Sequence, residues 1–264
     1  MTSSHSRFPL AMANLVGFVV MVVVNALATT IPLGGMTTGQ LSDLYPNLFV
    51  PAGLTFSIWG VIYLLLGIFV VYGIVFSLRK AEPSSSFIEK VGILFVMSCP
   101  ANAGWIFSWQ YRVLPLSLVC MIILLLSLLF IYRQLTIGRS KAKPLEKYLV
   151  HLPMSIYLGW ISIATIANVT ALLVHYKWDR FGINDQVWAI IMIGIGILLA
   201  LIMLLIKRDI FYTLVVDWAI LGILLKRIGV DHSSAQGVIV TSIVGLCLLT
   251  LGIIIQIVRG KVYR

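Results

Sequence analysis

The stretch from Tyr157 to Asn168 carries the side chains best suited to binding chemistry. It reads Tyr-Leu-Gly-Trp-Ile-Ser-Ile-Ala-Thr-Ile-Ala-Asn and lies deep inside a long apolar segment. A helix here would place four of its residues on one face, at positions i, i+3, i+7 and i+11: Tyr157, Trp160, Ala164 and Asn168. Large rings above a small residue, with an amide one turn further on, can form a notch for a flat ligand. The same pattern can equally form a seam where two helices pack.

Two earlier apolar segments show a related pattern. One places Asn102 three residues before Trp105, and the other places Phe56, Trp59 and Tyr63 on one helical face. A deep indole needs a hydrogen-bond partner, and a buried amide is costly in hydrocarbon unless it is bonded. Ligand contact and hydrogen bonding between helices both meet these needs, and the residues alone leave the choice open.

Other chemistry has little support in the sequence. Asp217 is the only acid well inside an apolar segment, so we expect it to be protonated, paired or facing water. It is either a proton or cation site or a hydrogen bond between helices. The three cysteines have no metal or redox spacing, and we find no nucleotide-binding glycine loop and no nucleophile elbow. We therefore predict no metal site and no catalytic residue, and favour a non-enzymatic role.

Composition places the chain in a membrane. Of its 264 residues 60% are hydrophobic and 11% are charged, against about 25% charged in soluble domains. Apolar runs of about 20 residues follow one another without alternation, which predicts an all-α polytopic membrane protein and excludes a barrel. The net charge of +10 resides in short loops, so it sets orientation in the membrane and we expect no nucleic-acid partner.

The apolar runs predict eight helices and one long loop. The loop, Leu33 to Val50, is a candidate lid with a helical turn over Gln40 to Leu44. The expected helices are Phe8–Ile31, Leu54–Leu78, Phe87–Tyr111, Pro115–Leu135, Leu145–His175, Val187–Ile206, Ile210–Leu225 and Ala235–Val258.

The basic residues predict the orientation. All but five of the 19 Lys and Arg residues fall at the termini or in the even-numbered loops, and the five exceptions are Arg112, Lys177, Arg180, Lys226 and Arg227. The positive-inside rule then puts both termini in the cytoplasm. We expect a multi-pass protein of the bacterial inner membrane.

Three stretches, taken in order, carry a family resemblance. Pro51-Ala-Gly-Leu-Thr-Phe-Ser-Ile-Trp-Gly-Val-Ile-Tyr63, Asn102-Ala-Gly-Trp105 and the run from Trp160 to Asn168 resemble the TspO/translocator-protein (tryptophan-rich sensory protein) family. That family carries P-P-x-W-x-F…W-x-x-x-Y, N-A-x-W and Y-x-x-W-x-x-x-A-x-x-x-N on the second, third and fifth of five helices. The likeness runs from Phe8 to His175. It implies a TspO-like five-helix domain over residues 1–176, followed by a three-helix extension over residues 177–264.

The resemblance implies a pocket inside the five-helix bundle that opens towards the first loop. Known family ligands are porphyrins, sterols and flat aromatic drugs, bound without a required cofactor. The positions expected to contact the ligand are Phe49, Phe56, Trp59, Tyr63, Asn102, Trp105, Tyr157, Trp160, Ala164 and Asn168. The lid side departs from the family pattern, because Phe49 and Leu54 stand where tryptophans are expected and Ala52 replaces the second proline. These departures argue against porphyrin photochemistry, which draws on a pair of tryptophans.

The first hypothesis is an integral membrane binding protein, a sensor or transporter, for a flat hydrophobic ligand such as a porphyrin, a sterol or an isoprenoid-like lipid. The alternatives are a membrane enzyme that modifies a bound tetrapyrrole or lipid, a proton-coupled transporter that uses Asp217, and a structural subunit. We expect the bilayer and a small hydrophobic ligand as partners. Glycines on the sixth and eighth helices allow a homodimer and equally allow packing within the chain. Anchoring or packing is expected of the remaining tryptophans: Trp109, Trp178, Trp188 and Trp218.

Overall fold

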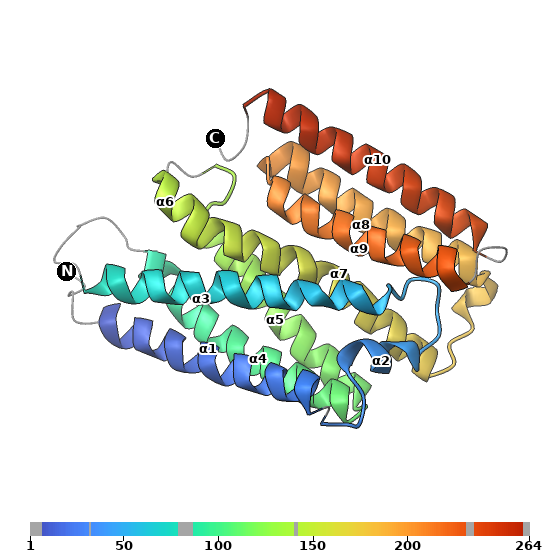
Figure 1. The fold of residues 1–264 in the computed structure, drawn as a ribbon, viewed down its shortest axis with the longest axis horizontal. Helices are drawn as coiled ribbons and strands as arrows, with labels where there is room; N and C mark the ends of the chain where they lie inside the picture. Colours follow the sequence, from blue (N-terminus) through green and yellow to red (C-terminus); the bar gives the residue numbers. More distant parts are fainter. Residues whose placement is uncertain (1–6, 32, 79–86, 140–141, 231–234, 261–264) are drawn as a thin grey trace.

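The computed structural model describes residues 7–31, 33–78, 87–139, 142–230 and 235–260. These residues form helices and connecting turns, without strands. Figure 1 shows the long helices side by side, with α7 between a lower and an upper group. The long helices are α1 (Arg7–Thr30), α3 (Ile58–Ser77), α4 (Phe87–Gln110), α5 (Leu114–Gln134), α7 (Leu152–His175), α8 (Asp185–Lys207), α9 (Ile210–Val230) and α10 (Gln236–Val258). The short ones are α2 (Thr38–Asp43), η2 (Gly53–Ser57), α6 (Pro144–Glu146), η3 (Lys147–His151) and η4 (Arg180–Gly182).

Among the described residues, seven helices are long and apolar enough to cross a membrane. They are α1, η2 with α3, α4, α5, α6 through α7, α8 and α10. The expected seventh helix, α9, falls outside this set and carries Asp217, Lys226 and Arg227. It runs five residues further than Leu225, to Val230, and packs against α7, α8 and α10. The all-α polytopic fold is thus confirmed, with α9 enclosed by apolar neighbours.

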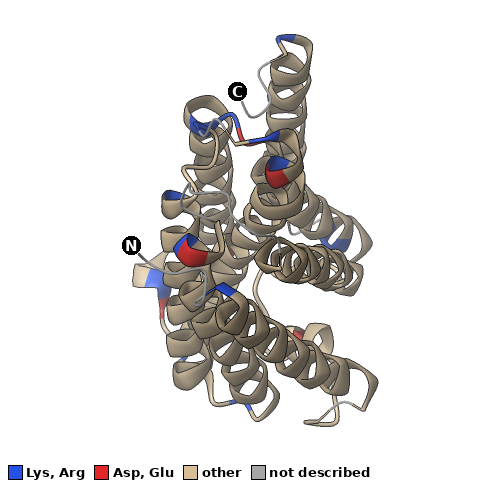
Figure 2. Ribbon diagram, turned by 90° about the vertical axis from the view of Figure 1, so that its left-hand side faces the viewer, with Lys and Arg blue, Asp and Glu red and all other residues tan. Residues whose placement is uncertain are grey.

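The first and last helices share one end of the bundle. α1 begins and α10 ends at the left of Figure 1. Figure 2 looks onto this end and shows Lys and Arg at the ends of several helices. Five of the basic residues that the sequence assigns to this end of the bundle lie outside the described residues: Arg79, Lys80, Lys141, Lys261 and Arg264. The cytoplasmic placement of this end stays a prediction.

A buried hydrogen-bond network fixes the centre of the lower group. The Asn25 amide on α1 donates to Asn102 Oδ1 on α4 at 2.7 Å, and the Asn102 amide donates to the Tyr157 hydroxyl on α7 at 2.9 Å. Both Asn102 and Tyr157 are fully buried. In a medium without water such groups must find partners inside the protein. The structure therefore uses Asn102 to bond helices together, one of the two roles left open by the sequence.

A second network joins the two groups at the end that holds the termini. The carboxylate of Asp209, in the turn between α8 and α9, accepts hydrogen bonds from Tyr132 on α5 at 2.9 Å and from Ser155 on α7 at 2.7 Å. Its other oxygen accepts the first free backbone N–H groups of α9, from Phe211 and Tyr212, both at 3.1 Å. Burial raises the pKa of Asp209, and these four donors oppose that rise. Asp209 lies between two apolar segments of the sequence, and the structure buries it completely.

We expect Asp209→Ala to destabilise the protein more than Asp209→Asn. Alanine removes the cap of α9 and leaves the hydroxyls of Tyr132 and Ser155 without their acceptor, at a cost of about 2–4 kcal/mol. Asparagine keeps one oxygen for the cap and offers an amide to the hydroxyls. Thermal unfolding in detergent measures the difference. Equal midpoints for the two variants would contradict this role.

Candidate functional site

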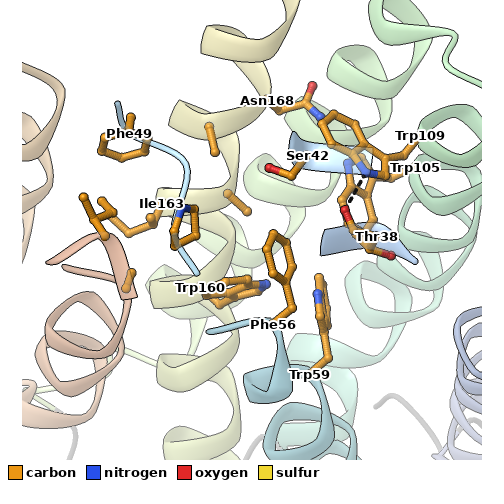
Figure 3. A pocket seen from close by; sticks show the side chains of 15 residues that line it. Thr38, Ser42, Phe49, Phe56, Trp59, Trp105, Trp109, Trp160, Ile163 and Asn168 are labelled. Atoms are coloured by element: carbon orange, nitrogen blue, oxygen red, sulfur yellow. Dashed lines mark hydrogen bonds between the residues drawn. The ribbon is translucent and has the colours of Figure 1, made fainter. Parts of the chain in front are cut away.

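An aromatic cavity lies at the end of the bundle away from the termini, beneath α2. Figure 3 shows its wall, in which rings from α3, α4, α7 and η2 face one another. We call it the inner cavity, and its lining residues are Thr38, Ser42, Phe49, Pro51, Phe56, Trp59, Trp105, Trp109, Trp160, Ile163, Ala164, Ala167, Asn168, Ala219 and Ile223. Its free volume is about 50 Å³.

Four indoles dominate this wall. Trp59 lies 5.7 Å from Trp105 and 6.1 Å from Trp160, measured between ring centroids. Trp105 in turn stacks on Trp109 at 6.3 Å. Phe56 meets Trp160 edge to face at 6.0 Å. Rings at these spacings attract one another and also present broad π faces to a flat guest.

Three polar atoms of the lining have no hydrogen-bond partner among the described residues. They are Nε1 of Trp105, Nε1 of Trp160 and Oδ1 of Asn168. All three side chains are almost completely buried, and a buried polar atom left unbonded costs about 1–3 kcal/mol. The amide nitrogen of Asn168 does have a partner, the hydroxyl of Ser117 on α5, at 2.8 Å. That bond fixes the side chain and leaves its oxygen free to accept.

The structure brings together seven of the ten residues predicted to contact a ligand. Phe49, Phe56, Trp59, Trp105, Trp160, Ala164 and Asn168 line the inner cavity. The other three are Tyr63, Asn102 and Tyr157. Tyr63 stacks on Trp59 at 5.4 Å, and Tyr157 meets the same indole edge to face at 6.2 Å. Tyr63 and Tyr157 therefore support Trp59, Asn102 holds Tyr157, and none of the three lines the inner cavity.

The sequence analysis missed several residues of the wall. Trp109 was expected to be an anchor or a packing residue, yet it is buried in the lining and donates to the Thr38 carbonyl of α2 at 3.3 Å. Its position seven residues after Asn102 was the available signal. Ala219 and Ile223 belong to α9, in the extension. The local sequence does not indicate that Ala219 and Ile223 line the cavity, because only the packing of distant helices brings them there.

Helix α9 also holds the loop that covers the cavity. The Ala52 N–H donates to the Gly222 carbonyl, and the Trp218 indole donates to the Thr55 carbonyl, both at 2.9 Å. Lys226 forms an ion pair with Asp43 at the end of α2. The expected pocket within five helices is therefore corrected: a sixth long helix forms part of its wall and fastens its cover.

Asp217 lies apart from the inner cavity. Its Oδ2 accepts a hydrogen bond from Thr250 on α10 at 2.8 Å, and its Oδ1 has no partner. The described residues contain no group of three or more His, Cys, Asp or Glu side chains that could hold a metal ion. The chemistry that the inner cavity offers is stacking on indoles, with two N–H donors and one amide acceptor.

A family model described as TSPO-like protein matches residues 11–255. No curated protein and no solved structure gives a match. The family match continues past His175, where the sequence motifs end, and includes α8, α9 and nearly all of α10.

The contact between α9 and η2 gives a test of this wall. A Cβ at Gly222 would overlap the Thr55 side chain, with Thr55 Cγ2 only 2.8 Å away, so Gly222→Ala must push α9 and η2 apart. We expect a loss of about 1–3 kcal/mol and a red shift of the tryptophan emission. Gly229→Ala is the matched control on the same helix, because a Cβ there meets nothing within 4 Å. Similar melting curves for the two variants would argue against the contact.

Proposed function

Because the chain belongs to the TSPO-like family and is an integral, multi-pass membrane protein, we propose that it binds a flat hydrophobic ligand in the inner cavity, as a sensor or carrier. The ligand class is a porphyrin, a sterol or an isoprenoid-like lipid. Indole faces would stack on the body of the ligand, and the free atoms of Trp105, Trp160 and Asn168 would meet its polar groups.

The observation that supports this proposal is that three unbonded polar atoms line one aromatic cavity. Asn25, Asn102, Tyr157 and Asp209 find partners within the protein. Two indole nitrogens and one amide oxygen of the inner cavity have no partner in the described part of the chain, and other unpartnered atoms, Asn14 Oδ1, Ser242 Oγ and Gln256 Oε1 among them, lie outside this lining. A wall selected only for packing would gain stability by satisfying or removing these atoms. A ligand with an acceptor and a donor would satisfy them.

The small volume of the inner cavity means that the cavity must open before it can bind a ligand. Sites for drug-sized ligands have about 300–1,000 Å³, and the inner cavity has about 50 Å³. A ligand of the proposed class therefore requires the cover of α2 and residues 44–57 to move outward. The cover rests on a few polar contacts, one to Trp109 on α4 and the others to α9, among them the partly exposed pair of Lys226 and Asp43. Exposed pairs of this kind contribute at most about 1 kcal/mol, so opening is compatible with ligand binding.

We expect Ala164→Phe to abolish or weaken binding at least tenfold, because the added ring fills the inner cavity. The measurement is a titration of the detergent-purified protein with protoporphyrin IX, cholesterol and retinol. Tryptophan emission reports the binding of the two coloured ligands, and cholesterol binding is measured by displacement of a coloured ligand.

Trp160→Phe should weaken binding about threefold to tenfold, because it keeps a ring and removes the N–H donor.

Val169→Phe is the matched control. Val169 lies on the same helix and is 37% exposed, on the side away from the cavity. Its substitution should leave binding unchanged. The proposal is wrong if no saturable binding of any of the three ligands is found, or if Ala164→Phe and Val169→Phe bind equally well.

A further inference from the structure

A second hollow lies beside the inner cavity, at the same end of the bundle. This outer cleft has a free volume of about 310 Å³, within the range of small-molecule sites. It is lined by residues of the cover loop, the end of α7, the turn that follows and the start of α8: Pro46, Asn47, Leu48, Phe49, Thr170, Leu173, Val174, Lys177, Trp178, Asp179, Arg180, Asp185, Trp188 and Ala189. Its lining is far more polar than that of the inner cavity.

Phe49 is the one residue that both linings share. Its side chain is 3% exposed, so the ring fills the boundary between the two spaces. Helix α7 runs past both of them. Ala164, Ala167 and Asn168 line the inner cavity, and Leu173 and Val174, one to two turns further on, line the outer cleft. One elongated molecule could therefore lie along α7 in both spaces if the ring of Phe49 turned aside.

Among the charged side chains that line the outer cleft, one cation has no ion pair with the described part of the chain. Arg180 pairs with Asp185 at 2.9 Å, and Asp179 caps the turn by accepting from the Phe181 N–H at 3.0 Å. Lys177 is exposed, and its side chain has no hydrogen bond or ion pair with the described part of the chain. Two indoles, Trp178 and Trp188, stand edge to face at 4.8 Å in the same lining.

The positive-inside rule does not account for these cations. Arg112, Lys177, Arg180, Lys226 and Arg227 belong to the end of the bundle that the rule assigns to the opposite side. Lys177 and Arg180 line the outer cleft, and Lys226 and Arg227 line the adjoining groove, which shares Pro46, Asn47, Leu48 and Asp185 with it. The basic residues of this end are thus concentrated around the cleft.

We propose that the outer cleft is a second subsite, which takes the anionic head of an amphipathic ligand whose flat apolar body enters the inner cavity past Phe49. Lys177 meets the head, a carboxylate or phosphate, and the indoles of Trp178 and Trp188 flank it. This inference rests on the proposed function and specifies its ligand: an apolar body with one acidic end.

Retinoic acid and retinol test the subsite, because they share one flat body and differ in the head. Titration at about pH 8, where a carboxylic acid is ionised, should show retinoic acid binding about threefold to tenfold more tightly than retinol, as expected for a partly exposed charged contact. Lys177→Gln should remove this preference and leave retinol binding unchanged.

Arg112→Gln is the matched control. Arg112 and Lys177 are both cations that follow a long helix at this end, and both have a left-handed backbone, with φ of 60° and 53°. Arg112 lies outside both linings. Its substitution removes the same charge and should keep the preference for the acid.

Phe49→Ala tests the connection between the two spaces. Removing the ring opens the boundary, so association of retinoic acid, followed by quenching of the cavity indoles in stopped flow, should become at least severalfold faster. An unchanged association rate would overturn the passage past Phe49.

The outcomes separate the two proposals. Equal binding of retinoic acid and retinol, or an undiminished preference in Lys177→Gln, overturns the outer subsite while the inner cavity stands. Absence of binding by both retinoids also overturns it, and the proposed function then depends on the porphyrin and the sterol.

Discussion

The absence of water in the bilayer core governs this structure. A polar group buried there must find its partner inside the protein, and the chain meets this demand with a few long-range hydrogen bonds. Asn25, Asn102 and Tyr157 bond three helices to one another, and Asp209 bonds α5 and α7 to the start of α9. In the lining of the inner cavity, by contrast, the indole nitrogens of Trp105 and Trp160 and the amide oxygen of Asn168 have no partner in the described part of the chain.

Two of the three C-terminal long helices, α8 and α9, take part in the cavity linings as well as in the fold. α9 contributes Ala219 and Ile223 to the wall of the inner cavity and bonds to the loop that covers it. The start of α8 and the preceding turn complete the outer cleft. Residues 177–264 therefore form part of both linings. The family match over residues 11–255 agrees with this view.

Much of this arrangement could be predicted from local sequence. Hydrophobic runs gave the long helices to within a few residues, and helical spacing gave the shared face of Trp160, Ala164 and Asn168. The rest depended on contacts between distant segments. Asn102 could have faced a ligand or a helix, and only the position of Tyr157 decides between them. The burial of Asp209 has no local signal either, because its side-chain partners Ser155 and Tyr132 lie 54 and 77 residues away.

The position of α9 in the wall has a consequence for the order in which the protein is made. Helices leave the ribosome from the N-terminus onwards, so α1 to α7 enter the bilayer while the α9 segment is still being synthesised. Until α9 arrives, the side of the inner cavity formed by Ala219 and Ile223 faces lipid, and the loop ahead of η2 lacks the Gly222 carbonyl that holds it. The ligand space is thus completed late in biogenesis. A nascent chain arrested before that point would present an open, lipid-filled trough.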